Sequence, residues 1–264
     1  MTESDQTRYA DKIAALLRKA ESTPHPEEAE SFFTKAAELM AKYRIDEAML
    51  AQREGRKADD QYAEEEFVTI GIYRHALYWL DCYCLWAAGC ELYEISRPGP
   101  RTLDGKEYKQ TRVIVGAGFK SDLDSARMLA TSLKLQAMRA ETSWWDANEY
   151  RYEWDTKGNQ HAARRGFMLA YAQGAWTIMK KANKEAEQAA QDEQGEGTSV
   201  ALVLANKSDI VKHEFQKRHS DLREGRASRM NDGGYEARAA GYAEGKKADV
   251  GTGKVGSGRK AITS

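Results

Sequence analysis

Two apolar stripes separated by a pair of prolines fix the beginning of this chain as helical. In the first stripe, apolar side chains recur at helical spacing at Tyr9, Ile13, Leu16, Leu17 and Ala20. Pro24 and Pro26 end this helix near Ser22, because a proline disfavours helical geometry in the residue before it. The second stripe has the same spacing and consists of Ala29, Phe32, Phe33, Ala36, Leu39, Met40 and Tyr43. Residues 1–50 therefore predict an antiparallel helical hairpin.

Particular residues of this hairpin carry a resemblance to a known family. They are Lys12-Ile13, Leu16-Leu17, Lys19-Ala20, Ser22-Thr23, Glu28-Ala29-Glu30, Phe32, Lys35-Ala36, Leu39-Met40, Lys42-Tyr43 and Ile45-Asp46. Together they resemble the N-terminal signature of domain-of-unknown-function family 2786, which is widespread in bacteriophages and bacteria. The resemblance implies that the α+β domain that often follows this signature continues the chain, chiefly through the runs at 164–169 and 200–204. It implies no activity and no catalytic residues.

Composition limits the classes of protein to be considered. The formal net charge is −1 over 264 residues, so the molecule as a whole is no strong binder of polyanions, although a local basic patch stays open. The three cysteines, Cys82, Cys84 and Cys90, are too few and too clustered for a disulfide framework. The sequence shows neither a secretory signal nor an apolar run of the roughly 20 residues that cross a bilayer. We therefore expect a cytoplasmic protein without a membrane partner.

After the hairpin, the pattern indicates a second domain. Residues 51–66 are charged and predict a linker, and residues 67–70 form either a first short strand or the lead into a helix. A helix is expected over 74–88, buried on much of its circumference because Tyr78, Trp79, Tyr83 and Trp86 widen its apolar stripe. Residues 91–96 and 108–115 flank a turn-rich segment, which predicts an antiparallel β-hairpin.

The second half of the chain is predicted to be mainly helical. We expect helices over 123–144, 160–188 and 209–218, an irregular aromatic segment between the first two, and a strand over 199–205. Residues 221–264 are rich in glycine and predict a flexible tail with at most a short helix near 235–247. The predicted fold is α+β: the hairpin, then a domain over 67–220 in which long helices cover a small, mainly antiparallel sheet.

Two short motifs are reminiscent of nucleotide-binding proteins. Gly116, Gly118 and Ser121 follow a strand and precede a helix, as in a dinucleotide-binding turn, but the third glycine and the later acidic residue are missing. Asn206-Lys207-Ser208-Asp209 is similar to the guanine-reading motif of GTPases, but Gly253-Lys254 does not complete a phosphate-binding loop. We favour a strand-to-helix turn for the first motif and a helix N-cap at Asp209 for the second.

The cysteine cluster is a third candidate site. Cys82, Cys84 and Cys90 with His75 supply four residues of the type that binds zinc. On a helix, however, Cys82 and Cys84 point to nearly opposite sides. No neighbouring feature activates a thiol for catalysis with His161 or His213. We therefore expect buried thiols, no metal and no cofactor.

The aromatic segment is the binding site that the sequence favours. Trp144, Trp145, Tyr150, Tyr152 and Trp154 alternate with charged residues. Irregular aromatic segments stack on bases, sugars or partner side chains, although several of these rings could instead cover the sheet as core. The next helix carries basic residues that either contact phosphates or form a solvated extension; they are Arg164, Arg165, Lys180, Lys181 and Lys184.

These patterns favour a non-enzymatic binding protein. We expect an accessory protein of a phage or other mobile element whose partner is a host protein, a phage protein or a nucleic acid. The alternative is an enzyme or sensor that acts on a nucleotide or nucleic acid, with its ligand at the 116–121 turn or near 206–209. A third possibility is DNA binding through the lysines of the N-terminal hairpin.

Overall fold

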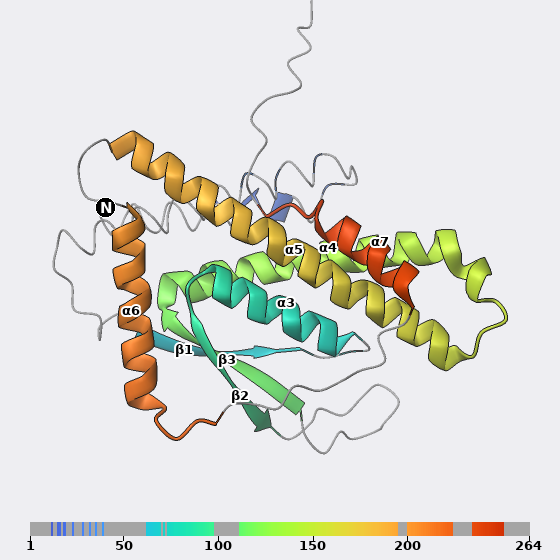
Figure 1. Ribbon diagram of the computed structural model, residues 1–264, viewed down its shortest axis with the longest axis horizontal. Coiled ribbons are helices and arrows are strands. Elements are labelled where there is room, and N and C mark those ends of the chain that lie inside the picture. The colour runs from blue at the N-terminus through green and yellow to red at the C-terminus, as the bar shows by residue number, and fades with distance from the viewer. Residues whose placement is uncertain are drawn as a thin grey trace, which may run out of the picture.

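A computed structural model describes residues 62–69, 71, 73–97, 111–194, 200–223 and 234–250, with scattered residues between 12 and 39. Apart from those scattered positions, the predicted hairpin of residues 1–50 lies outside the described residues. The elements are β1 (Tyr62–Val68), α3 (Arg74–Ala87), β2 (Glu91–Arg97), β3 (Thr111–Phe119), α4 (Lys120–Asn148), η2 (Glu149–Tyr152), α5 (Lys157–Gln194), α6 (Val200–Arg218) and α7 (Tyr235–Gly245). Figure 1 shows their arrangement.

The three strands form one antiparallel sheet in the order β1–β3–β2. The pairing of β2 with β3 confirms the predicted β-hairpin, and the sheet with its long helices confirms the α+β class. β1 begins at Tyr62, inside the segment predicted as a linker. Its charged residues misled the prediction because β1 is an edge strand, where charged side chains are common. The crossover through α3 makes β1 and β2 parallel to each other on either side of β3.

The helices α3 and α4 cover one face of this sheet. A Cβ atom added at Gly116 would lie 2.5 Å from Leu85 of α3 and 3.0 Å from Leu123 of α4. A Cβ atom at Gly118 would lie 2.9 Å from the sulfur of Cys90. Both glycines are inside β3, so the predicted strand-to-helix turn is wrong. They are small because Leu85 and Leu123 press against the strand at Gly116, and Cys90, between α3 and β2, does so at Gly118.

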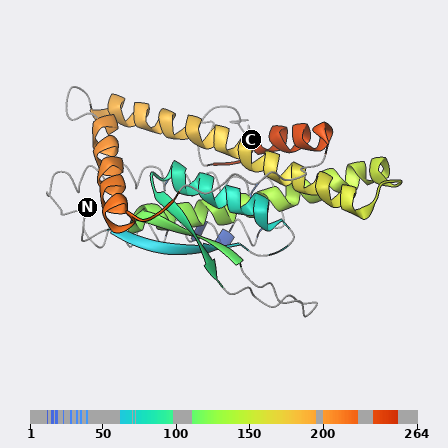
Figure 2. The same ribbon diagram turned by 60° about the horizontal axis from the view of Figure 1, so that its bottom comes forward.

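A third layer consists of α5 and α7, which lie side by side over α3 and α4 (Figures 1 and 2). The backbones of α5 and α7 are nearly in contact. A Cβ atom would lie 2.1 Å from the carbonyl oxygen of Phe167 if added at Gly241, and 2.1 Å from that of Tyr171 if added at Gly245. Residues 235–250 are therefore packed on the domain, although the sequence predicted a flexible tail from residue 221. The short helix expected near 235–247 is present as α7.

The opposite face of the sheet is contacted by α6, which stands at one end of the molecule (Figure 2). The ring of Phe215 lies 6.1 Å from that of Tyr93 on β2, and the Nζ atom of Lys207 lies 4.7 Å from the centre of the Phe119 ring on β3. The strand predicted over 199–205 is wrong, because α6 begins at Val200. A short apolar run does not distinguish a strand from a helix, and here the run continues into helical spacing.

Candidate binding surface

The helix α3 has two faces of different character. Toward the interior it presents small and aliphatic side chains, namely Ala76, Leu80, Cys84, Leu85 and Ala87. His75, Tyr78, Trp79, Tyr83 and Trp86 follow at i, i+3, i+4, i+8 and i+11, which places their rings along one side of the helix. Because α3 lies beside α5, Trp176 joins this row of rings. We call the rings of Tyr78, Trp79, Tyr83, Trp86 and Trp176 the aromatic face.

The rings of the aromatic face form a continuous network. The rings of Tyr83 and Trp176 stack with centroids 5.4 Å apart and planes 12° apart. Trp86 lies 5.8 Å from Tyr83 and 6.3 Å from Trp176, and Trp79 lies 5.9 Å from Tyr83. These separations are in the range of favourable aromatic pairs. The network therefore links α3 and α5 through side chains that lie outside the aliphatic core.

Trp86 is the most exposed ring of this network, with 41% of its surface accessible. The other four rings are half-buried. The sequence predicted a helix that is buried on much of its circumference. Trp86 is an exception, because its ring is exposed. In Figure 1, α3 and α5 face the viewer with no other labelled element crossing in front of α3. An indole that is supported by its neighbours and open on one side is suited to stack against a ligand.

Cationic side chains flank the aromatic face at both ends. At one end, the Nζ atom of Lys180 lies 5.2 Å from the centre of the Trp176 ring, and Lys184 follows one helical turn later. At the other end, Arg74 and Arg112 are exposed. The acid at this end, Glu94, accepts a 3.0 Å hydrogen bond from Tyr78 and lies 3.2 Å from the Nε atom of Arg112.

The imidazole at the beginning of α3 is affected by the same cations. The pKa of His75 lies below its ordinary value because burial disfavours the charged ring and because Arg112 and Arg74 repel it. The neutral ring of His75 is nearly parallel to that of Tyr78, with centroids 6.4 Å apart. At this end of the aromatic face the environment therefore disfavours additional positive charge.

The aromatic segment predicted as a binding site is divided by the structure. The helix α4 continues to Asn148, so Trp144 and Trp145 are helical rather than part of an irregular segment. Trp144 is partly buried and stacks on Phe167 with centroids 4.9 Å apart. Trp145 is only 7% exposed, and its ring stacks on Tyr152 at 5.4 Å. These rings pack α4 against α5 and η2.

The two predicted arginines lie beside these rings. Arg164 donates hydrogen bonds to both carboxylate oxygens of Glu141, and its guanidinium group lies 5.0 Å from the centre of the Trp145 ring. Because Glu141 is almost completely buried, Arg164 is its buried counter-ion. Arg165 is half-buried, one position further along α5.

The remaining two rings of the segment are at the surface. Tyr150 is 66% exposed and Trp154 is 93% exposed, at the turn between α4 and α5. Arg151 donates 3.1 Å hydrogen bonds to the hydroxyl of Tyr150 and to Glu236 at the start of α7. We call Tyr150 and Trp154 the aromatic tip.

Buried ionic pairs account for other polar residues of the interior. Asp81 is fully buried on α3, accepts a 2.7 Å hydrogen bond from Thr69, and lies 2.6 Å from the Nζ atom of Lys134. Asp122, at the start of α4, lies 2.9 Å from the Nζ atom of Lys207. Each pair joins two elements that are distant in sequence, which is a structural role.

The second of these pairs bears on the GTPase-like motif. Residues 206–209 are in the interior of α6, and Lys207 forms an ion pair with Asp122. Asp209 lies nine residues after the start of α6, so the predicted helix N-cap is wrong. A guanine-reading motif follows a strand, and α6 supplies a helix instead.

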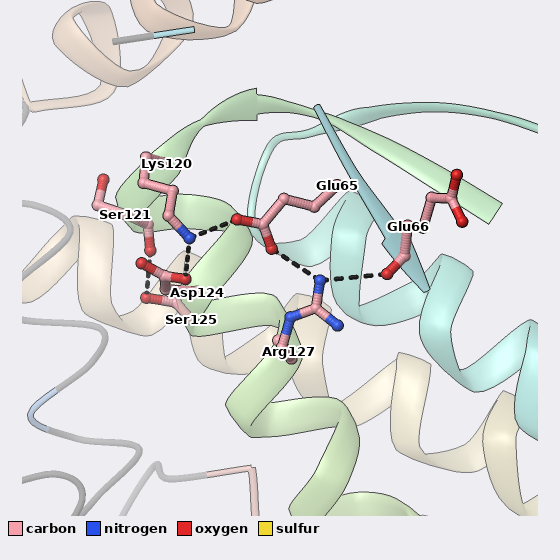
Figure 3. Close-up of polar contacts among 7 residues, drawn as sticks. All are labelled: Glu65, Glu66, Lys120, Ser121, Asp124, Ser125 and Arg127. Atoms are coloured by element: carbon pink, nitrogen blue, oxygen red, sulfur yellow. Dashed lines mark hydrogen bonds and ion pairs between the residues drawn. The ribbon is translucent and has the colours of Figure 1, made fainter. Parts of the chain in front are cut away.

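A network of acids and bases surrounds the other nucleotide-like motif, and Figure 3 shows how it joins β1 to α4. Lys120 contacts both Glu65 and Asp124, and Arg127 donates a 2.7 Å hydrogen bond to Glu65. The amino end of α4 also holds the buried carboxylate of Asp122. Three carboxylates at a helix N-terminus disfavour a phosphate there, because they already complement the helix dipole.

A histidine and a carboxylate meet on the opposite face of the sheet. The Nε2 atom of His219 and the hydroxyl of Tyr93 each lie 2.9 Å from a different oxygen of Glu64. Burial raises the pKa of this carboxyl, but the hydrogen bonds from His219 and Tyr93 outweigh it, so the pKa lies below its ordinary value. The contacts attach the end of α6 to the sheet.

The cysteines lie in the interior, and none is in a disulfide. Burial raises the pKa of Cys82 to about 12 and the pKa of Cys84 well above its ordinary value. Such thiols are poor nucleophiles at neutral pH. Within the described part of the chain, no three residues of the metal-binding types come together as a ligand set.

Comparison with known proteins identifies the beginning of the chain. Residues 8–47 match the family model described as "Protein of unknown function (DUF2786)". This match confirms the resemblance inferred from the hairpin residues. A search of the curated proteins and a search of the solved structures find no match. None of the described helices is long and apolar enough to cross a membrane.

The DUF2786 match ends before β1, so the aromatic face lies entirely in the part of the chain that it does not cover. Four of the five rings of this face recur along α3, so the sequence alone showed that α3 carries a row of aromatic side chains. It did not show that Trp176, 90 residues after Trp86, packs against them, because that contact depends on how α5 crosses α3. Only the structure brings the two helices together.

Proposed function

We propose that this chain is an accessory binding protein that acts inside the cell, and that the aromatic face is its contact surface. The observation that carries the proposal is the exposed ring of Trp86, which packs against Tyr83 and Trp176. Large aromatic side chains dominate the energy of many binding surfaces when neighbouring contacts hold them in place. The reduced state of the three cysteines is consistent with an intracellular location.

Binding is favoured over catalysis by the state of the reactive groups. The described buried acids Asp81, Glu141 and Asp122 are engaged in ion pairs, and burial raises the pKa of the thiols of Cys82 and Cys84. The alternative of an enzyme or sensor acting on a nucleotide has less support, because carboxylates surround the amino end of α4. The resemblance to a family common in bacteriophages supports a role for the protein in a phage or other mobile element.

The aromatic tip is a second candidate contact surface, favoured by the 93% exposure of Trp154. This tip is the part of the predicted 144–154 segment that remains accessible. It has fewer rings than the aromatic face, and the Trp154 ring is almost entirely in solvent. We propose it as a site for a protein partner, subordinate to the aromatic face.

In-cell photo-crosslinking tests the proposal and separates the two surfaces. A photoreactive phenylalanine derivative replaces Trp86 in one version of the protein and Trp154 in another, and each is expressed in cells that naturally encode the protein. Both positions are exposed, so the replacement leaves the fold intact. We expect a light-dependent adduct from position 86. Adducts from position 154 alone would support the tip, and no adduct from position 86 would contradict the proposal.

A further inference from the structure

We infer that the ligand of the aromatic face is a single-stranded nucleic acid, an inference that rests on the proposed function. The rings of this face are flat and its flanking charges are positive: Lys180 and Lys184 at one end, Arg74 and Arg112 at the other. A ligand that matches both features has flat unsaturated faces and regularly spaced negative charges. Nucleic acids combine stacking bases with phosphates in this way.

The charges argue against a cationic ligand. Aromatic cages bind quaternary ammonium groups and other cations. Here Lys180 already lies over Trp176, and at the far end burial, with smaller contributions from Arg112 and Arg74, lowers the pKa of His75. The acid among the described residues of this end, Glu94, is bonded to Tyr78 and Arg112. At Lys180 and Lys184 a second cation would meet repulsion, whereas a phosphate would meet attraction.

The accessibility of the rings selects single strands over duplexes. The bases of a duplex are stacked on each other, so their faces cannot reach protein rings without being flipped out. In a single strand every base offers a face to an aromatic side chain. Trp86 can be reached by such a face, because 41% of its surface is accessible while Tyr83 and Trp176 pack against it.

The length of the surface favours several nucleotides over one. From His75 to Trp86, α3 rises about 16 Å at 1.5 Å per residue. Lys180 and Lys184 extend the surface past Trp176 along α5. A mononucleotide would cover only one end of this row, whereas a short strand can cover its length and reach Lys180 and Lys184. The net charge of −1 for the whole chain means that the attraction is local.

Fluorescence anisotropy with labelled oligonucleotides tests the inference on the full chain. The probes are single-stranded DNA and single-stranded RNA of roughly 12 nucleotides, a length within the range of known single-strand sites. A duplex of the same sequence and a strand of equal length with abasic sugars in place of nucleosides are the comparison probes. We expect a single strand with bases to bind more tightly than either comparison probe. The DNA and RNA arms show which sugar the surface prefers.

Variants assign the binding to the aromatic face. Trp86→Ala should weaken single-strand binding by roughly 5- to 100-fold, the effect of removing one stacking ring. Lys180→Gln should lower the slope of log affinity against log salt concentration by about 0.7, the contribution of one phosphate contact in a single strand. The matched controls are Tyr235→Ala and Lys181→Gln, which change an exposed ring outside both surfaces and the neighbouring exposed lysine on α5. Both should bind like the unchanged protein.

The outcomes separate this inference from the proposed function. Equal affinity of Trp86→Ala, Lys180→Gln and the unchanged protein would overturn the inference, as would equal binding of the abasic strand. If no oligonucleotide binds but position 86 crosslinks to a protein in cells, the inference fails and the aromatic face stands as a protein-binding surface. If position 86 yields no adduct, the proposed function fails with it. Because Lys180 is exposed, Lys180→Gln gives an answer even if Trp86→Ala is unstable.

Discussion

The ring of Tyr83 on α3 stacks on the ring of Trp176 on α5, with centroids 5.4 Å apart and an angle of 12° between the planes. The contact joins residues of two helices that are 93 positions apart in the sequence. Trp86 packs against both of these rings, so this exposed indole has a defined position. The aromatic face is thus one surface made by two helices.

The two tryptophans of the predicted binding segment should differ in their effect on stability. Trp145→Ala removes a buried ring that stacks on Tyr152 and lies under Arg164, and should cost about 3–5 kcal/mol of the free energy of unfolding. Trp154→Ala removes an almost fully exposed ring and should change it by less than about 0.5 kcal/mol. Urea unfolding measures both. Similar losses for the two variants would contradict the assigned burial.

The close contact of α5 and α7 predicts that Gly241 does not tolerate a methyl group. In Gly241→Ala the Cβ atom would lie 2.1 Å from the carbonyl oxygen of Phe167, so the helices must move apart. We expect a loss of about 1–3 kcal/mol, despite the gain in helix propensity of about 1 kcal/mol. Thermal unfolding measures the loss.

Gly158 provides the control for this substitution. It lies in the first turn of α5, where a Cβ atom would come no closer than 3.7 Å to Thr156. Gly158→Ala should therefore be neutral or stabilising by up to about 1 kcal/mol. If Gly241→Ala were as stable as Gly158→Ala, the packing of α7 on α5 would be wrong.

Removal of the counter-ion of Asp81 should produce a pH-dependent loss of stability. Lys134→Met leaves a buried carboxylate unpaired and should cost about 3–5 kcal/mol near neutral pH. Burial already raises the pKa of Asp81, and Lys134 and Thr69 oppose that effect. Without Lys134 the folded-state pKa rises further above the unfolded value. Protonation then favours the folded state, so the loss is smallest below about pH 4 and grows as pH rises through the folded-state pKa.

A double substitution isolates the titrating group. Asp81→Asn combined with Lys134→Met keeps an acceptor for Thr69 but has no carboxyl at this position. The loss of unfolding free energy in this double variant should not grow as pH rises, whereas the loss in Lys134→Met should. Urea unfolding of both variants across a pH series gives the comparison. A pH-independent loss in Lys134→Met would exclude Asp81 as the source.

The cysteines should react slowly in the folded protein. Burial raises the pKa of Cys82 to about 12, and Cys84 and Cys90 are also buried. At pH 8 few of the Cys82 and Cys84 thiols are ionised, and iodoacetamide cannot reach any of the three buried side chains. Mass spectrometry should find little alkylation of the folded protein and complete alkylation in denaturant. Rapid modification of the folded protein at any of the three would indicate an exposed thiol.

The elements predicted well from sequence are those whose signal is local. The pairing of β2 with β3 follows from two apolar runs around a turn-rich segment, and the short helix near 235–247 follows from its own composition. The α+β class follows from both. These predictions needed no knowledge of which elements meet in space.

The predictions that failed depended on distant partners. The run at 200–204 has strand-like residues, yet it begins a 19-residue helix. The glycines of 241 and 245 indicated flexibility by composition, whereas they are small because α5 lies against them. Likewise, no pattern within 144–154 shows that Phe167 and Arg164 cover Trp144 and Trp145. In each case a tertiary contact determines what the residue does.

Photo-crosslinking of a single strand that carries 5-iodouracil, followed by mapping of the modified peptide, tests the central claim most directly. The method joins the base to an aromatic side chain on which it stacks. The account predicts adducts on Trp86 or on its neighbours Trp79 and Tyr83, with none on Trp154. Adducts confined to Trp154 or to residues outside the aromatic face would contradict it.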